Sequence, residues 1–83
     1  MRILYFAHFR EKVNIAEEDI GIPDGVIDVK TLIDWLITRN IGFANAFSDL
    51  EHVRVAVNQE HVELNMPLKM DDEVAFFPPM TGG

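Results

Sequence analysis

The C-terminal stretch Phe76-Phe77-Pro78-Pro79-Met80-Thr81-Gly82-Gly83 most constrains what this chain can form. Proline has no backbone N–H to donate to a sheet, and its ring pushes the preceding residue towards an extended conformation. A strand that reaches Phe77 therefore cannot continue. The sequence predicts a folded domain over residues 1–77 and an extended tail over residues 78–83, which reaches roughly 20 Å at about 3.3 Å per residue.

The end of the tail, Gly82-Gly83, carries no side chains. A backbone without Cβ atoms fits channels that are too narrow for other residues, and it leaves the terminal carboxylate open to attack. We therefore predict that the Gly83 carboxylate is the reactive group. The segment predicted to insert into a partner consists of Pro78, Pro79, Met80, Thr81, Gly82 and Gly83. The alternative interpretation is a frayed, inert chain end.

The composition indicates one small globular domain without cysteine chemistry. The chain has 83 residues, of which 48% are hydrophobic, and no cysteine. Disulfides, thiolate metal sites and a cysteine nucleophile are therefore excluded. A formal charge of −7 disfavours nucleic acid and anionic membranes, and favours a partner with a basic face. No N-terminal signal or apolar run of spanning length is present, so we expect a cytosolic protein.

The N-terminal part has the pattern of two strands. Residues 1–9 are predicted to form the first, because apolar residues occupy both alternating faces. One face carries Ile3, Tyr5, Ala7 and Phe9, and the other carries Leu4 and Phe6. Residues 14–22 are predicted to form the second strand, and its acidic side chains suit a sheet edge.

The remaining segments predict one main helix and three further strands. The helix is expected from Val29 to about Asn40, with Asp28 as N-cap and Asn40 or Gly42 ending it in a left-handed conformation. A short helical turn should follow over residues 43–47. Further strands are expected over residues 53–57, 61–64 and 73–77. This order predicts an α+β fold of the β-grasp (ubiquitin-like) class, with the first and last strands parallel at the centre of a mixed sheet of about five strands.

One main helix can cover only one face of such a sheet. The other face should be polar, yet it carries five apolar residues: Leu4, Phe6, Ala56, Ala75 and Phe77. A contiguous apolar patch beside the tail is typical of a docking surface, so these five are the predicted partner-binding residues. The alternative is that Phe47 or a loop covers them.

No self-contained active site is apparent in the sequence. The three histidines lack metal-ligand spacing, and the only serine, Ser48, has no glycine-flanked elbow. We therefore predict no metal, no bound cofactor and no catalysis by the chain alone. Any chemistry would be completed by another protein.

Several stretches resemble the small-subunit (sulfur-carrier) family of molybdopterin synthase. They are Leu4-Tyr5-Phe6-Ala7, Arg10-Glu11, Val55-Ala56-Val57-Asn58-Gln59, Pro67-Leu68, Asp72-Glu73-Val74-Ala75-Phe76-Phe77-Pro78-Pro79 and Thr81-Gly82-Gly83. Departures are Asp71, where the family usually has a turn glycine, and His61, where an apolar partner-facing residue is common.

The resemblance implies a sulfur carrier that works with two partners. An adenylyltransferase similar to ubiquitin-activating enzymes would use ATP to adenylate Gly83, which is then converted to a thiocarboxylate. The loaded tail would enter the large synthase subunit and donate sulfur to cyclic pyranopterin monophosphate, building the molybdopterin dithiolene. The family assembles as a heterotetramer of two small and two large subunits.

Three alternatives remain open. The chain could carry sulfur in thiamine or tRNA thiolation, although thiamine carriers are usually shorter and lack Phe-Phe-Pro-Pro. It could be a ubiquitin-like modifier of lysines, although Thr81 stands where such tails usually have a basic residue. It could also be a plain interaction domain with an inert tail.

Overall fold

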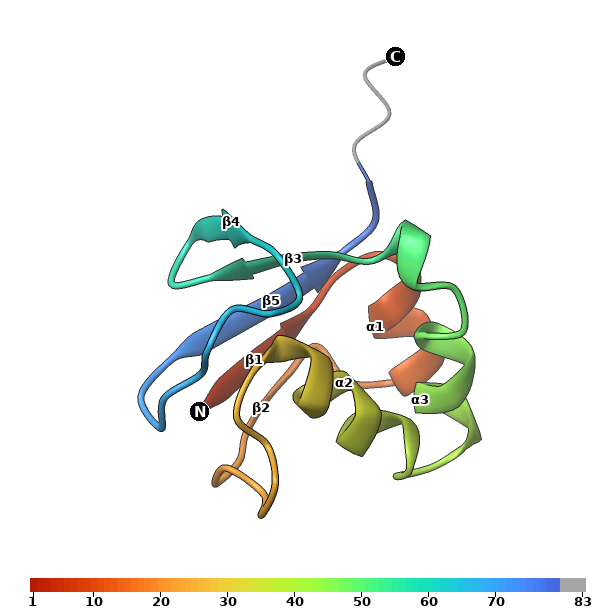
Figure 1. Cartoon of the computed structure of the whole chain (residues 1–83). Helices are drawn as coiled ribbons and strands as arrows, with labels where there is room; N and C mark the ends of the chain where they lie inside the picture. The colour runs from red at the N-terminus through yellow and green to blue at the C-terminus, as the bar shows by residue number, and fades with distance from the viewer. Residues whose placement is uncertain (80–83) are drawn as a thin grey trace.

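The computed structural model describes residues 1–79 as a five-stranded mixed sheet with helices on one side (Figure 1). The elements in chain order are β1 (Arg2–Tyr5), α1 (His8–Val13), β2 (Glu17–Asp19), α2 (Val29–Ile37), α3 (Ile41–Ala46), the 3-10 helix η1 (Leu50–His52), β3 (Arg54–Val57), β4 (Glu60–Val62) and β5 (Glu73–Phe77). The strand order across the sheet is β2-β1-β5-β3-β4. The predicted β-grasp fold is confirmed.

The centre of the sheet is the parallel pair formed by the first and last strands. Ile3 of β1 lies opposite Val74 of β5, and Tyr5 lies opposite Phe76. All other strand pairs are antiparallel. The predicted parallel pairing is therefore confirmed, as is the edge position of the acidic strand β2, which spans fewer residues than predicted.

The prediction of a strand over residues 1–9 is wrong beyond Tyr5. Ala7 has φ 52° and ψ −130°, a conformation that L residues rarely adopt and that turns the chain out of the sheet. The helix α1 begins at the next residue. Phe9 is buried as predicted, but from this helix and not from a strand, and Ala7 is exposed instead of sharing its face.

The main helix α2 begins where the sequence predicts and ends earlier. The Asp28 carboxylate accepts the backbone N–H of Thr31 at 2.8 Å, and the Thr31 hydroxyl accepts the N–H of Asp28 at 3.1 Å. Such a capping box satisfies two orphan donors of the first turn. The helix ends at Ile37, and Asn40, with φ −169°, is the N-cap of α3. The predicted left-handed helix end at Asn40 is wrong.

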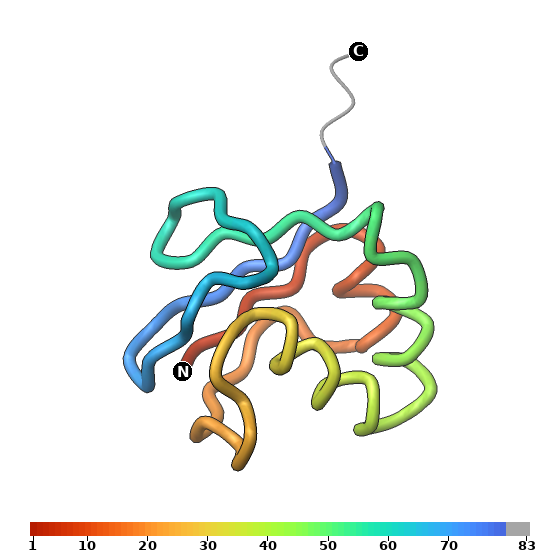
Figure 2. Tube along the Cα trace, in the orientation of Figure 1, coloured from red at the N-terminus to blue at the C-terminus, as the bar shows by residue number. Residues whose placement is uncertain are grey.

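All three α-helices bury their apolar residues against the same face of the sheet. The core combines Phe9 and Val13 of α1, Leu32 and Leu36 of α2 and Phe43 of α3 with inward residues of the strands. Leu4, Ala75 and Phe77 are not part of this core cluster. The tube trace in Figure 2 follows the same single helical layer. Among residues 1–79, no helix covers the opposite face of the sheet, which we call the outer face.

Candidate docking face at the root of the tail

The strand register brings the predicted partner-binding residues together on the outer face. Leu4 of β1 lies opposite Ala75 of β5, and Ala75 lies opposite Ala56 of β3. The row continues to Glu17 of β2 on one side and to His61 of β4 on the other. An apolar centre with polar ends therefore crosses the whole sheet.

A second row lies nearer the tail. Phe77, the last residue of β5, lies opposite Arg54 of β3, and the ring of His61 contacts the Phe77 ring edge-on at 5.2 Å between centroids. On the other side of β5, the backbone N–H of Phe6 donates to the carbonyl of Phe76 at 3.1 Å. The alternation of the strand places Phe6 on the face of Leu4.

These five residues differ in how much they are exposed. Phe6 is 48% exposed, Leu4, Ala75 and Phe77 are half-buried, and Ala56 is buried at the middle of the row. The alternative in which Phe47 covers them is wrong. Phe47 is buried in the core, with its ring 4.9 Å from that of Phe76 and 5.2 Å from that of Phe9.

The first two tail residues, Pro78 and Pro79, follow directly after Phe77 of this face. Pro78 and Pro79 are half-buried and lie outside the strand, as their missing N–H groups require. The remaining predicted insertion residues, Met80, Thr81, Gly82 and Gly83, lie outside the described residues. The predicted reactive group at Gly83 therefore remains a prediction.

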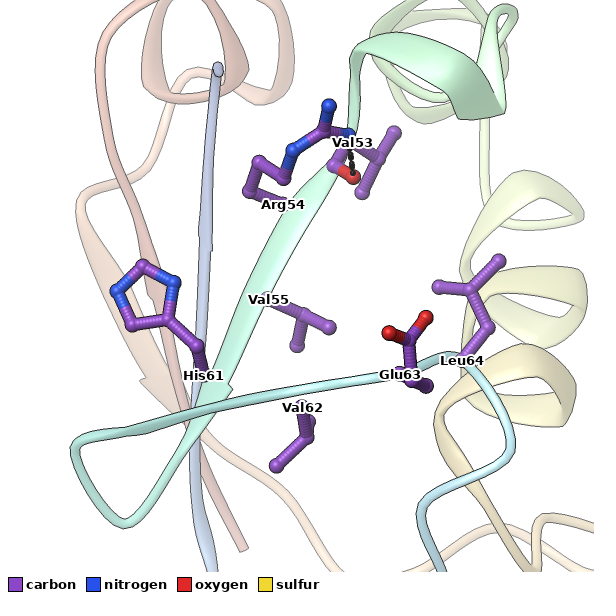
Figure 3. Close-up of a pocket in the computed structure, with 7 residues that line it drawn as sticks. All are labelled: Val53, Arg54, Val55, His61, Val62, Glu63 and Leu64. Carbon is purple, nitrogen blue, oxygen red and sulfur yellow. Dashed lines mark hydrogen bonds between the residues drawn. The ribbon is translucent and has the colours of Figure 1, made fainter. Parts of the chain in front are cut away.

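Arg54 is a charged residue of this face to which the sequence reasoning gave no role. Its Nη1 donates to the carbonyl oxygens of Glu51 at 2.9 Å and Val53 at 3.1 Å. Figure 3 shows Arg54 and His61 on one side of β3, and Val62 and Leu64 on the other. These residues, with Val53, Val55 and Glu63, line a hollow of about 560 Å³ beside the face. Spacing alone marks Arg54 only as an outward residue between two buried valines.

A partly buried polar cluster lies at the β1–β2 edge of the sheet and consists of Tyr5, Glu18 and Arg39. The Tyr5 hydroxyl donates to Glu18 Oε2 at 2.7 Å, and Arg39 Nη1 donates to the same oxygen at 2.7 Å. The Arg39 guanidinium also lies 5.2 Å from the Trp35 ring and 4.5 Å from the Phe43 ring. Burial, followed by the hydrogen bond to Glu18, raises the pKa of Tyr5. This cluster fastens β1 and β2 to the C-terminal end of α2.

Residues 1–79 offer no group of three potential metal ligands among His, Cys, Asp and Glu. Within that same range, no helix is long and apolar enough to cross a membrane. Within residues 1–79, the arrangement provides an apolar surface with Glu17 at one edge and Arg54 and His61 towards the other.

The sequence pattern of the ThiS family matches residues 3–83, which is nearly the whole chain and includes the Gly-Gly end. The chain belongs to the ThiS family. Two relatives bear the name molybdopterin synthase sulfur carrier subunit. The one from Escherichia coli (strain K12) is 34% identical, with 100% of this chain and 99% of the relative covered. The one from Homo sapiens is also 34% identical, with 100% and 93% covered.

Solved structures of other proteins share this fold. SAMP1 from Haloferax volcanii superposes with a TM-score of 0.77 and 27% identity, covering 100% of this chain and 98% of that one. A putative molybdopterin converting factor, subunit 1, from Pyrococcus furiosus gives a TM-score of 0.75 and 33% identity, with 95% of each chain covered. The ThiS family chain described here therefore has relatives named as a sulfur carrier and as SAMP1.

Proposed function

We propose that this ThiS family chain is the sulfur carrier subunit of a molybdopterin synthase. The observation that carries the proposal is the continuity between the apolar outer face and the tail. Phe77 ends the central strand in that face, and Pro78 and Pro79 follow it directly. The relatives from Escherichia coli and Homo sapiens, each aligned over the full chain, carry this name. The outer face would dock on the large subunit, while the tail enters its active site.

The reactive step would occur at Gly83 and requires activation by a second partner. A carboxylate is a poor electrophile, so an ATP-dependent adenylyltransferase would join it to AMP, with release of pyrophosphate. A reduced sulfur donor then displaces AMP and leaves a thiocarboxylate. This soft, ionised sulfur is a strong nucleophile at neutral pH, as thiolates are. ATP is bound by the activating enzyme and not by this chain.

The thiocarboxylate would next supply sulfur to cyclic pyranopterin monophosphate in the large subunit. Each new C–S bond replaces a C–O bond of the pterin side chain, whose oxygen leaves that carbon. Water then cleaves the acyl–sulfur bond, and the Gly83 carboxylate is restored for another cycle. Two such transfers complete the dithiolene. We propose that this takes place in the cytoplasm, in a heterotetramer of two small and two large subunits.

The residues of this chain would bind the large subunit and deliver the sulfur, and the partners would supply the acid–base groups. Leu4, Phe6, Ala56, Ala75 and Phe77 form the docking surface, and Pro78 and Pro79 stiffen the root of the tail. Thr81, Gly82 and Gly83 would pass through a narrow channel because they are small. Met80 lies between these two parts of the tail.

Intact-mass measurement tests the proposal. The chain is incubated with the activating enzyme, ATP and a sulfur donor, and then with the large subunit and the pterin precursor. We expect a mass increment equal to the exchange of one oxygen for sulfur, followed by its loss as molybdopterin forms. Deleting Gly83 should abolish loading and leave the thermal unfolding midpoint unchanged. Loading without pterin sulfuration would point to thiamine or tRNA thiolation.

A second candidate function is protein modification. The observation that favours it is the similarity to structures described as a small archaeal modifier protein, one of which has a TM-score of 0.76 at 26% identity over 96% of this chain. A modifier would form an isopeptide bond between Gly83 and a lysine amine. Thr81 disfavours this, since ubiquitin-type tails usually have a basic residue there. Lysine adducts in the same mass spectra would support it.

A further inference from the structure

Only one nitrogen of the Arg54 guanidinium, Nη1, is hydrogen-bonded within residues 1–79. Both of its hydrogen bonds within residues 1–79 come from Nη1, to the carbonyls of Glu51 and Val53. Over that range, Nε and Nη2 donate to no protein atom, and no carboxylate lies within ion-pair distance. Two carbonyls therefore hold the group in place, while the edge formed by Nε and Nη2 is left open.

That open edge is the one that binds a carboxylate side-on. Arginine presents Nε and Nη2 as a planar fork whose spacing fits carboxylate oxygens. Arg2 uses the same two nitrogens in this chain, since its Nε donates to Glu17 Oε2 at 2.8 Å and its Nη2 contacts the same oxygen. In Arg54 the same edge is held in a fixed orientation, and no acceptor among residues 1–79 binds it. This is so although the sequence contains 14 acidic residues.

The position of Arg54 makes this edge relevant to docking. Arg54 is exposed and lies directly opposite Phe77 in the β3–β5 ladder, and the His61 ring of the next strand, β4, also contacts the Phe77 ring. A partner that covers Phe77 also removes water from Arg54. A charge that loses water without gaining an acceptor weakens association strongly, so a partner that fits this face must offer one.

We infer that the large subunit places a carboxylate against the Nε and Nη2 edge of Arg54 when the outer face docks. This inference rests on the proposed function and adds the chemistry of the contacting group. The paired ions would lie at the β3–β4 side of the apolar centre, next to the root of the tail. Because the neighbouring row ends in Glu17 at the opposite edge of the sheet, the ion pair fixes the orientation of the partner on the face.

The test is the binding kinetics of variants with the large subunit from the same organism. Arg54→Gln removes the charge, and Arg54→Lys keeps the charge but loses the fork. Lys69→Gln is the matched control, because Lys69 is an exposed cation at the other end of β5, with no ion pair in residues 1–79. Thermal unfolding of each free variant checks that the domain stays folded.

We expect Arg54→Gln to raise the dissociation rate by about tenfold or more, with Arg54→Lys in between and Lys69→Gln unchanged. If Arg54→Gln and Lys69→Gln raise the dissociation rate equally, the effect comes from the change in net charge alone, and the inference is overturned. Wild-type kinetics for Arg54→Gln would also overturn it. In both cases the proposed function survives, since wild type still binds. Absence of wild-type binding would defeat the inference and the proposed function together.

Discussion

Gly42 shows how one residue sets the spacing of two helices. A Cβ built on Gly42 of α3 would lie 2.4 Å from the backbone carbonyl oxygen of Lys12, near the end of α1. A backbone atom inside a helix cannot move aside cheaply. The missing side chain therefore lets α3 pack closely on α1, and this position does not require glycine for its backbone angles.

We predict that Gly42→Ala destabilises the domain. Alanine gains about 1 kcal/mol of helix propensity over glycine. Overpacking against a fixed backbone costs about 1–3 kcal/mol, and the 2.4 Å approach to a backbone atom places the cost in the upper part of that range. A net loss of up to about 2 kcal/mol is therefore expected. Urea unfolding measures this difference.

Gly21→Ala is the matched control for that substitution. Nothing lies within 4 Å of a Cβ built on Gly21, and its φ is not in the left-handed region. Its free energy of unfolding should change by less than about 0.5 kcal/mol. If both alanine variants unfold at the same urea concentration, the close approach of α3 to α1 is not what makes Gly42 necessary.

At the scale of elements, Glu18 joins three of them through one carboxylate. Its Oε2 accepts from Tyr5 of β1 and from Arg39, which follows α2, while Glu18 itself belongs to the edge strand β2. The Arg39–Glu18 pair is partly buried, with the Glu18 side chain 14% exposed. Such a pair is screened less by salt than a surface pair.

This cluster predicts unusual titration of the single tyrosine. The ordinary pKa of tyrosine is about 10, and burial together with Glu18 raises that of Tyr5 in the folded chain. Folding therefore favours the neutral phenol. That contribution to stability is complete below pH about 10 and is lost as pH rises further, because the unfolded chain then ionises while the folded chain does not.

Phenolate absorbance measures this directly, because Tyr5 is the only tyrosine. The unfolded chain in urea should titrate near pH 10, whereas the folded chain should show phenolate only as it unfolds. Glu18→Gln should lower the folded midpoint without restoring the ordinary value, since burial is the larger cause. A folded wild type that titrates near pH 10 would refute the assignment.

The sequence predicted those elements whose pattern is local. The strand from Glu73 to Phe77 and the start of α2 at its Asp28 cap follow from alternation and capping chemistry. The helix α1 was missed because residues 1–9 also alternate well enough for a strand. What ends β1 is the backbone of Ala7, and an alanine in that conformation leaves no trace in a sequence pattern.

At the scale of the whole molecule, the apolar outer face was predictable from the sequence, and the open edge of the Arg54 guanidinium was not. Period-two alternation in three strands, combined with one layer of helices, places Leu4, Ala75 and Ala56 on the outer face. The open edge of Arg54 depends on two carbonyls that hold Nη1, and no spacing rule reveals such a contact. The reactive role of Gly83 is predicted from the absence of side chains at Gly82 and Gly83, and both residues lie outside the described range.

The adjacent residues Phe76 and Phe77 separate folding from docking. Phe76 is fully buried in the core, with its ring 6.2 Å from that of Tyr5 and 4.9 Å from that of Phe47. Phe77 points to the outer face and is half-buried. Consecutive strand residues point to opposite faces. The same substitution should therefore disturb folding at Phe76 and partner binding at Phe77.

We predict that Phe77→Asp folds with a thermal midpoint close to that of wild type but binds the large subunit at least about tenfold more weakly. It removes an aromatic contact from the apolar surface and puts a carboxylate directly opposite Arg54, where it can occupy the edge that the partner would use. Phe76→Asp should fail to fold, since a buried carboxylate without partners is strongly destabilising. Circular dichroism reports folding and titration calorimetry reports binding. Undiminished affinity of Phe77→Asp would mean that the outer face is not the surface that docks. Phe77 contacts the partner only if the large subunit lies flat on β5 and β3, which is also the arrangement that brings a carboxylate to Arg54.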